Sequence, residues 1–597
     1  MKDILNKYFS TLVYFYRYLR YRIFLVVGLT FVYGVMDGFG LSMFLPLFQI
    51  ASDREERGVS STAGSDNGMV QFFRSMHIDF TLSNMLLIMF LFFLFKGIFF
   101  YVKGVNDARV SRYFITRVRR SFVGKFSKLD YKHFVMSDIG RIQNLMTGET
   151  NNLFYAFKDY LSVLQSAVMV LVYMVFAFAM NAQFALFIVV GGVLFNFIFQ
   201  KIYKYTKTAS GKLVKAGNNY QGMVIQLVSN FKYLKATGTV PTYAKKINGN
   251  IDEIEHINFR MGKLSALSNA IREPILIGIV ALVILLQVYV LGGRLSTIIV
   301  SLLFFYRALA SVSNLQSAYN SFIARHGTME NVADFQKEMD EHKEVQGSQP
   351  FTHLENVLSL RDVCFSYENY HILKKLNLDI KRNTTVAFVG ESGSGKTTLI
   401  NVIAGLLVNT DGLYLVDKVD IKVLDRESFQ KKIGYISQDA TIFNDSIYNN
   451  VTLWADKNDE ANIAKFQKAI ADAQLGEFIR GLENAEDTLL GNNGINVSGG
   501  QKQRISIARE LFKDVEVLIL DEATSALDSE TEKYIQESID SLKGSCTILI
   551  VAHRLATVKN ADEIVLMKNG TILDVDSFDN LKEKSPVFKR MVELQEV

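Results

Sequence analysis

Long apolar stretches fill much of the chain before residue 330 and are missing after it. The clearest of them run over 85–101, 161–180, 184–199 and 275–291. Each is about long enough to cross a bilayer core of roughly 30 Å as an α-helix. The pattern predicts a helical membrane domain followed by a domain of a different kind.

We expect six spans in the first domain, and the polar segments between them are very unequal. The spans are predicted near 22–50, 82–115, 150–180, 183–205, 268–292 and 295–325. Residues 181–183 and 292–296 make two short connections on one side, whereas the connections on the other side are long and basic. Because Lys and Arg collect on the cytoplasmic side of a membrane, the long connections are predicted to be cytoplasmic.

Two segments flank the first spans. Residues 1–22 mix basic and aromatic side chains, which is typical of an interfacial elbow helix rather than a cleaved signal. Residues 52–83 would form an external loop, in which 69–76 is either a short amphipathic helix or a surface loop with one apolar anchor.

Composition sets the domain boundaries and argues against one class of partner. We predict a transmembrane domain over 1–330, a linker over 331–350 and a second domain over 351–597. The net charge of +5 comes from basic residues beside the apolar runs, so no nucleic-acid partner is expected. The two cysteines, Cys364 and Cys546, suggest a reduced compartment without a disulfide framework.

A glycine-rich turn follows an apolar strand at 385–389. It reads Gly390-Glu-Ser-Gly-Ser-Gly-Lys-Thr397, and its glycines at 390, 393 and 395 let backbone N–H groups approach phosphate oxygens. Lys396 is expected to reach the β- and γ-phosphates of a nucleotide, and the Thr397 hydroxyl to bind Mg²⁺. A chance match is disfavoured by the strand before the turn and the helix expected after it.

A second apolar strand, 517–520, delivers two carboxylates, Asp521 and Glu522. Asp521 is placed to hold Mg²⁺, and Glu522 is placed to orient and deprotonate the attacking water. Two adjacent carboxylates alone would be weak support, but their position after a buried strand in the same domain as a phosphate loop favours nucleotide hydrolysis.

Three further segments carry a family resemblance: 497–504 (VSGGQKQR), 521–528 (DEATSALD) and 551–554 (VAHR). With the phosphate loop, they make the second half resemble the nucleotide-binding domain of ABC transporters. Six spans ahead of one such domain resemble the exporter branch of this family. The resemblance implies a multidomain fold: an all-α polytopic membrane domain with six transmembrane helices, followed by an α/β P-loop NTPase domain.

The resemblance also assigns roles in binding ATP and Mg²⁺. It implies that Tyr367 stacks on adenine, that Gln438 senses Mg²⁺ and the membrane helices, and that His553 contacts the γ-phosphate. Further nucleotide contacts are implied for Ser392, Thr398, Ser498, Gly499, Gly500, Gln501 and Asp528. For His553 and Tyr367 the alternatives are a core histidine and a surface aromatic, which this spacing disfavours.

The ATP site implied by the resemblance is shared between two subunits, because the segment around Ser498 completes the site of the opposite chain. The protein is therefore expected to dimerise with a second half-transporter. All site residues are present, which favours a homodimer, with a heterodimer as the alternative. Two departures from the family pattern are Val497, where Leu is usual, and 488–494, which lacks a Glu that many exporters carry.

Ionisable groups inside the spans bear on the substrate. Asp37 and Lys96 either pair with each other or face a cavity, and we leave both alternatives open. A cavity lined by Lys96, Arg272 and Arg307 would attract phosphate or pyrophosphate. This chemistry favours an amphipathic, anionic, lipid-linked substrate.

A narrower resemblance points the same way. Residues 37–52, 146–153 and 304–309 are similar to bacterial flippases for lipid-linked oligosaccharides, which implies a bacterial inner membrane. The N-terminus and the nucleotide-binding domain are expected in the cytoplasm, because the long connections are basic and ATP must be bound on that side. The alternatives are a general lipid, multidrug or peptide exporter and, from another class, a non-pumping ATP-gated channel or regulator. Residues 130–139 and 220–229 are candidate segments for coupling ATP binding to the membrane helices.

Overall fold

The computed structural model describes residues 13–44, 46–47, 81–180, 182–285, 289, 295–521, 537, 539–552 and 558–595. The chain divides into two compact units. Unit 1 contains Met1–Leu129 and Met136–Lys343, and unit 2 contains Asp130–Val135 and Glu344–Val597. The predicted domain boundaries are not tested by this division, and the predicted external loop lies outside the described residues up to residue 80.

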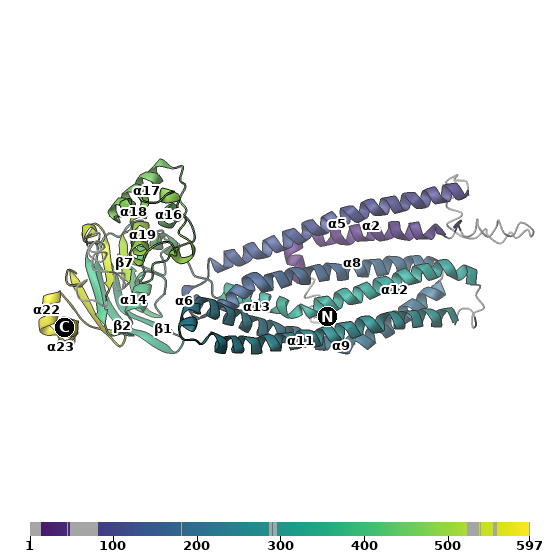
Figure 1. Ribbon diagram of the computed structural model, residues 1–597, viewed down its shortest axis with the longest axis horizontal. Helices are drawn as coiled ribbons and strands as arrows, with labels where there is room; N and C mark the ends of the chain where they lie inside the picture. Colours follow the sequence, from purple (N-terminus) through teal and green to yellow (C-terminus); the bar gives the residue numbers. More distant parts are fainter. Residues whose placement is uncertain are drawn as a thin grey trace, which may run out of the picture. The chain divides into compact units, whose positions relative to one another are not determined.

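Unit 1 is built from long helices that run side by side (Figure 1). They are α2 (Arg22–Ser42), α5 (Leu82–Phe126), α8 (Thr150–Met180), α9 (Ala182–Ser229), α11 (Val240–Leu285) and α12 (Leu295–Ala324). Shorter elements are α6 (Tyr131–Met136), most of which belongs to unit 2, α7 (Ile139–Asn144), η1 (Leu145–Glu149), α10 (Phe231–Ala236) and α13 (His326–Glu341). Each predicted span coincides with one of the long helices over most of its length.

Three stretches of described helix are long and apolar enough to cross a membrane: Arg22–Ser42, Leu82–Phe126 and Ile139–Ala179. In the first half of α5, large apolar side chains such as Leu87, Phe90 and Phe100 are exposed. An exposed apolar surface of this kind is expected where lipid, rather than water, surrounds the helix. The count of six spans stays a prediction.

The second half of α5 turns its apolar side chains inward. Phe114 stacks on Phe157 of α8 with ring centroids 4.3 Å apart, and both rings are fully buried. Phe15 lies against the same two rings and is also fully buried. These contacts anchor the described part of the N-terminal segment in the helical bundle.

The helix α13 covers the first part of the predicted linker and is tied to the bundle of unit 1 by ion pairs. Lys125 Nζ lies 2.6 Å from Asp340 Oδ2, and Nη1 and Nη2 of Arg141 donate to the two carboxylate oxygens of Glu338. A bidentate Arg–carboxylate pair fixes orientation as well as distance. The segment up to residue 341 is thus a packed helix of unit 1.

Between α7 and α8 the helix widens into the π-turn η1, Leu145–Glu149. The Thr150 hydroxyl donates to the carbonyl of Leu145, 2.8 Å away and five residues earlier. This side-chain bond satisfies a carbonyl that lies in the altered backbone pattern. A π-turn holds one residue more than an α-turn and is frequent at functional sites.

Unit 2 contains two β-sheets. An antiparallel sheet has the order β2-β1-β4-β5, formed by β1 (Val357–Tyr367), β2 (Tyr370–Lys381), β4 (Asp411–Val416) and β5 (Val419–Asp420). The second has the order β10-β9-β3-β8-β7-β6, formed by β3 (Thr385–Gly390), β6 (Ile433–Ile436), β7 (Val517–Asp521), β8 (Thr547–Val551), β9 (Glu563–Lys568) and β10 (Thr571–Asp576). All its pairs except β9–β10 are parallel.

Helices cover these sheets and form a separate helical region within unit 2 (Figure 1). They are α14 (Lys396–Ile403), α15 (Arg426–Gln430), α16 (Ile447–Thr452), α17 (Glu460–Asp472), α18 (Gly476–Arg480), α19 (Gly499–Phe512), α22 (Phe578–Lys584) and α23 (Pro586–Gln595). The central strands β3, β7 and β8 are almost wholly buried, as expected for parallel strands covered on both faces.

Candidate functional site

The predicted phosphate loop connects β3 to α14. The strand ends at Gly390, and the helix begins at Lys396. Thr397 and Thr398 therefore lie in the first turn of α14, and Ser392 lies in the loop. A helix N-terminus presents unpaired N–H groups and the positive end of its dipole, which favours an anion at this place.

Two glycines of this loop have backbone conformations that other residues rarely adopt. Gly393 has a φ of 80° and Gly395 a φ of 100°. At Gly390 the constraint is space, because a methyl group there would lie 2.3 Å from the carbonyl oxygen of Met567 in β9. The loop can hold this shape only with glycine at these positions.

The side chain of Lys396 folds back over the loop. Its ammonium donates to the carbonyl oxygens of Gly390, at 2.8 Å, and Glu391, at 3.2 Å. Lys396 is buried, at 6% exposed. The cation is therefore held above the loop, where a bound phosphate would meet it.

The carboxyl ends of β3, β6, β7 and β8 meet at one edge of the sheet, because these strands are parallel neighbours. Asp521 ends β7 at this edge and accepts a hydrogen bond of 2.9 Å from the Tyr435 hydroxyl on β6. Burial raises the pKa of Tyr435, and the nearby negative charge of Asp521 raises it further. The phenol thus stays a donor and fixes the carboxylate predicted to hold Mg²⁺.

Three predicted site residues, Glu522, Asp528 and His553, lie outside the described residues. Gln438 lies two residues after β6 at the same edge and is exposed. Tyr367 ends β1 in the antiparallel sheet, 4.9 Å from Phe365 between ring centroids. Burial raises the pKa of Tyr367. The structure places Gln438 and Tyr367, and the roles assigned to all five residues stay predictions.

The predicted signature segment begins α19. Ser498 caps this helix: its hydroxyl accepts from the Gln501 N–H at 3.3 Å, while Gln501 Oε1 accepts from the Ser498 N–H at 2.8 Å. Gly499 and Gly500 provide the first turn between them. This reciprocal capping box leaves Ser498 and Gly499 exposed at the start of the helix.

Behind this segment, α19 is locked to α16 by a buried polar contact that the sequence analysis missed. Arg509 Nε donates to the carbonyl of Asn450 at 2.7 Å, and Asn450 is fully buried. Asn450 in turn accepts from the N–H of Phe443 and donates to its carbonyl. The partners lie 59 residues apart, so no local pattern could have revealed them.

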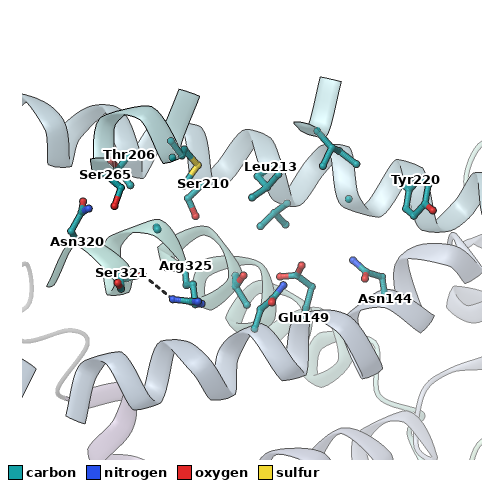
Figure 2. A pocket seen from close by; sticks show the side chains of 18 of the residues that line it. Asn144, Glu149, Thr206, Ser210, Leu213, Tyr220, Ser265, Asn320, Ser321 and Arg325 are labelled. Carbon is teal, nitrogen blue, oxygen red and sulfur yellow. Dashed lines mark hydrogen bonds between the residues drawn. The ribbon is translucent and has the colours of Figure 1, made fainter. Parts of the chain in front are cut away.

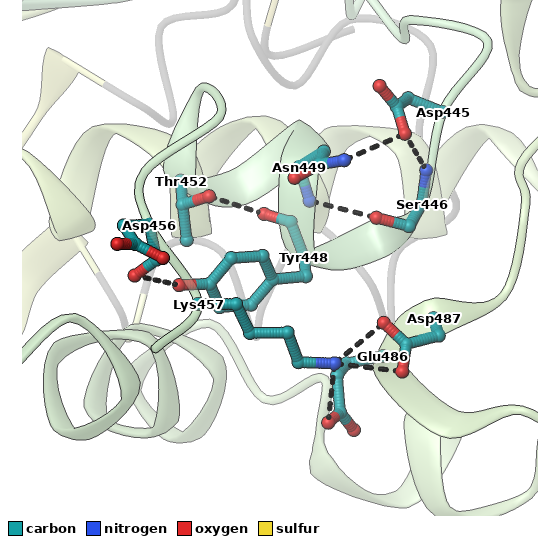
Figure 3. Close-up of polar contacts among 9 residues, drawn as sticks. All are labelled: Asp445, Ser446, Tyr448, Asn449, Thr452, Asp456, Lys457, Glu486 and Asp487. Carbon is teal, nitrogen blue, oxygen red and sulfur yellow. Dashed lines mark hydrogen bonds and ion pairs between the residues drawn. The ribbon is translucent and has the colours of Figure 1, made fainter. Parts of the chain in front are cut away.

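A network at the other end of α16 is shown in Figure 3. Asp445 accepts from the Ser446 N–H at 2.7 Å and from the Asn449 amide at 2.9 Å. Hydrogen bonding, chiefly from Asn449, holds the pKa of Asp445 below its usual range. Trp454, the only tryptophan of the chain, donates to the same carboxylate.

In unit 1, Asp37 and Lys96 pair with each other, which is one of the two alternatives left open by the sequence. Lys96 Nζ lies 2.6 Å from Asp37 Oδ1, and the side chains are 21% and 1% exposed respectively. The Tyr173 hydroxyl also donates to Asp37. The charge of Lys96 is thus matched by a buried carboxylate.

Neither of the other two predicted anion-binding residues contacts Lys96 within the described residues, but Arg307 lies within electrostatic reach of Tyr173, whose hydroxyl donates to Asp37. Arg307 lies on α12 with its side chain exposed, beside the buried Phe304 and Phe305. The Arg272 side chain lies outside the described residues. Their role stays a prediction.

The structure instead reveals a polar cavity of about 540 Å³ in unit 1, which the sequence did not predict (Figure 2). Its walls come from α7, η1, α8, α9, α11, α12 and α13. They are mostly amides and hydroxyls, including Asn144, Asn152, Thr206, Ser210, Tyr220, Gln221, Ser265, Asn320, Ser321 and Thr328.

One carboxylate and one guanidinium also line the cavity. Glu149 is 4% exposed; its Oε2 has no hydrogen bond within the described residues, while Asn152 and Thr328 lie within hydrogen-bonding reach of the carboxyl group. The same holds for the amide oxygen of Asn320. Arg325 is paired with Asp159. Figure 2 shows Glu149 and Ser210 projecting into the cavity from opposite sides, so it offers hydrogen-bond acceptors to a ligand rich in donors.

Comparison with known proteins matches two sequence families to the chain. The ABC transporter transmembrane region matches residues 23–311, and the ABC transporter family matches residues 373–525. An ATP-dependent lipid A-core flippase of Francisella novicida is 30% identical over 80% of this chain and 83% of the relative. The heterocyst differentiation ATP-binding protein HepA of Nostoc sp. is 29% identical over 82% and 80%.

A solved structure has a similar fold. A bacterial Atm1-family ABC exporter with ATP bound aligns with a TM-score of 0.81 at 21% identity, covering 97% of this chain and all of the other. The likeness extends through both units of the chain.

Proposed function

Because this chain belongs to the ABC transporter family, with a membrane region and an ATPase domain on one polypeptide, we propose that it flips an anionic lipid-linked oligosaccharide across the membrane. The predicted helical membrane domain followed by an ABC-type ATPase domain, and the half-exporter organisation, are confirmed by the family matches and the structural neighbour; the count of six spans stays a prediction. As in other members, ATP hydrolysis is coupled to transport. The finer proposal concerns the substrate.

The observation that carries this proposal is the polar cavity of unit 1. Its volume of about 540 Å³ lies within the usual range for ligand sites, roughly 300–1,000 Å³. A drug-binding cavity would be mostly apolar and aromatic, whereas most of the residues that line this one carry an amide, a hydroxyl or a charge. Sugar hydroxyls could donate to the open oxygens of Glu149 and Asn320 and accept from the neighbouring Asn, Ser and Thr groups.

The phosphate part of the substrate requires a cation. Since Asp37 already matches the charge of Lys96, we assign the main grip on a pyrophosphate to Arg307 and Arg272. A guanidinium can bind two phosphate oxygens at once, which a lysine ammonium cannot do with the same geometry. Lys96 then supports the helix packing around Asp37.

For the ATPase reaction, the loop conformation and the carboxylate at the sheet edge fit a nucleotide with Mg²⁺. Lys396 and the N–H groups of the loop from Gly390 would hold the phosphates. Thr397, Gln438 and Asp521 would hold the metal, which neutralises charge on the phosphates when bound. Glu522 would orient the attacking water, His553 would contact the γ-phosphate, and Tyr367 would stack on adenine.

Completion of this site calls for a second subunit. We propose that Ser498, Gly499, Gly500 and Gln501 contact the nucleotide held by the partner, with Ser392, Thr398 and Asp528 completing the contacts within each chain. A homodimer is favoured because one chain supplies both halves. We further propose a bacterial inner membrane location, with the ATPase domain in the cytoplasm.

A second candidate substrate is a lipid of the lipid A-core type, because several relatives are named as flippases for it. Both candidates are anionic glycolipids, so the cavity chemistry suits either. They differ in the lipid anchor and in the sugars, which a direct comparison can separate.

The test is ATPase activity of the full-length protein in nanodiscs. A polyprenyl-pyrophosphate glycolipid is compared with the same polyprenyl pyrophosphate without sugars and with lipid A-core, and Glu522→Gln provides the blank. We expect stimulation by the glycolipid and little by the sugar-free lipid.

Asn320→Leu should raise the half-saturating glycolipid concentration about tenfold, since it leaves polar partners unmatched. Asn314→Leu, an exposed position on the same helix, is the control.

The outcomes separate the proposals. Stimulation that is lost in Arg307→Ala and only partly regained in Arg307→Lys supports bidentate binding of phosphate at this residue. Stronger stimulation by lipid A-core than by the polyprenyl glycolipid would move the assignment to the second candidate. Equal stimulation by the sugar-free lipid would overturn the role of the polar cavity, while the ABC exporter assignment would stand.

A further inference from the structure

A second cavity of unit 1, of about 390 Å³, is lined by basic side chains, whereas the polar cavity offers hydrogen-bond acceptors. It lies between α9 and α11 and is lined by Lys204, Tyr205, Thr208, Ala209, Lys212, His256, Ile257 and Arg260. We call it the basic groove. Three of these side chains are permanent cations and a fourth is an imidazole, and none of the lining residues is acidic.

Helical spacing explains why these side chains converge. Lys204, Thr208 and Lys212 follow one another at intervals of four residues along α9, so they share one face of that helix. His256 and Arg260 are related in the same way on α11, which packs against α9. The two faces form the groove, and all four basic side chains are exposed.

The cations of the groove have no matching carboxylate in the lining. Asp252, one turn before His256 on α11, is not part of it. Elsewhere in unit 1, basic side chains such as Lys125, Arg141 and Arg325 are paired with acids. Like charges gathered on one surface repel one another, so this arrangement is stabilised by an anion that binds between them.

The position of the groove identifies the anion's source. Lys204 lies at the end of the predicted fourth span, and Lys212 lies about 12 Å further along the helix axis. On α11, Arg260 lies about 12 Å before the predicted start of the fifth span. The groove thus runs from the headgroup layer into the adjoining water. Basic pockets between membrane helices on the cytoplasmic side bind anionic headgroups.

We propose that the basic groove between α9 and α11 binds the phosphate headgroup of an anionic phospholipid from the surrounding leaflet. Lys204, Lys212 and Arg260 contribute the charge, and Thr208 and Tyr205 add hydroxyl donors. Thr208 lies between the two lysines on α9, where its hydroxyl can donate to a phosphate oxygen that both ammonium groups attract. This site is separate from the proposed glycan cavity and does not depend on which substrate is transported.

The experiment titrates the detergent-solubilised full-length protein with phosphatidylglycerol or phosphatidylcholine and counts bound lipids by native mass spectrometry. The test variant is Lys212→Gln/Arg260→Gln. The matched control is Lys215→Gln/Lys263→Gln, which removes two exposed cations from the same helices outside the groove. We expect phosphatidylglycerol to bind about 25-fold more weakly to the test variant, at about fivefold per cation, and unchanged to the control.

Three results would overturn the proposal. Equal losses in both double variants would mean that diffuse charge, not the groove, attracts the lipid. Equal binding of phosphatidylcholine would mean that the headgroup charge is not recognised. Displacement of phosphatidylglycerol by glycerol phosphate at equal concentration would make a soluble phosphate the occupant. Rescue by Lys212→Arg/Arg260→Lys supports the site, and none of these readouts requires transport or ATP hydrolysis.

Discussion

Gly140 of α7 packs directly against the backbone of Gly222 in α9. A methyl group on Gly140 would lie 2.5 Å from the Cα atom of Gly222, whereas a methyl group on Gly222 would meet its nearest atoms, the carboxylate oxygens of Asp138, at 3.9 Å. The contact is therefore asymmetric: one glycine is required by space and the other is not. Gly222 belongs to the segment 220–229 that we predict to couple ATP binding to the membrane helices.

Gly140→Ala should destabilise this contact because backbone atoms cannot move aside as a side chain can. We expect a cost of about 1–3 kcal/mol, which is typical of overpacking. Gly222→Ala should be neutral or stabilising by up to about 1 kcal/mol, since alanine favours helix over glycine. Thermal unfolding of the two variants in nanodiscs makes the comparison, and equal midpoints would argue against the close approach.

The pair Asp37–Lys96 predicts non-additive effects. Asp37→Asn or Lys96→Met alone leaves one charge without its partner, which typically costs about 3–5 kcal/mol for a buried pair. The double variant should recover much of this loss, because neither charge remains. A thermal-stability cycle of the four proteins measures the coupling, and additive losses would show that the 2.6 Å contact contributes nothing.

Because each ATP site is proposed to use residues of both subunits, two inactive variants should complement each other in a mixed dimer. Lys396→Ala and Ser498→Arg should each abolish ATP turnover, because each homodimer then carries the defect in both sites. A mixed dimer of the two variants has one doubly altered site and one intact site. Co-expression with two affinity tags and tandem purification should therefore restore up to about half of the wild-type rate. An ATP turnover rate of the mixed dimer no higher than that of the single variants would contradict the proposal that each ATP site uses both subunits and works independently of the other.

The two thiols of unit 2 should differ in reactivity. Cys364 is partly exposed, whereas burial raises the pKa of Cys546 to about 11. At pH 8 only about one Cys546 thiol in a thousand is then ionised, and the thiolate is the reactive form. Maleimide should modify Cys364 in the folded protein and leave Cys364→Ser unlabelled. Rapid labelling of Cys364→Ser at pH 8 would contradict the burial of Cys546.

The same pKa shift gives a pH dependence of stability. A raised folded-state pKa means that the folded protein holds the Cys546 proton more tightly than the unfolded chain does. This contribution is complete below pH 9, the ordinary pKa of the thiol, and is lost as the pH rises toward about 11. Cys546→Ala should remove this part of the alkaline loss, which thermal unfolding between pH 8 and pH 11 would detect.

The sequence predicted those parts of the site that are local in the chain. The phosphate loop needs a strand, a short turn with three glycines and then a helix, and all of these can be read from 385–398. The Tyr435 bond to Asp521 joins residues 86 positions apart and depends on β6 lying beside β7. No spacing rule within the sequence reports that neighbour relation.

The membrane domain shows a different limit. Apolar length predicts where helices form, but the face that each helix turns inward depends on its neighbours. For this reason the partner of Lys96 stayed open until the structure placed Asp37 beside it. The polar cavity was missed because its amides and hydroxyls are scattered over six elements, and each one alone resembles an ordinary surface residue.

The π-turn η1 determines how the side chains of α7 are rotated about the helix axis relative to those of α8. From Ile139 to Met180 the chain is helical throughout, and the extra residue in Leu145–Glu149 shifts everything before it relative to everything after it. Deleting one residue there would close the turn and keep the two faces in phase, whereas forcing the same residues into regular α-geometry would rotate α7 by about 100° relative to α8. Glu149 could then face the cavity, or Gly140 could meet α9, but the two could no longer be aligned together.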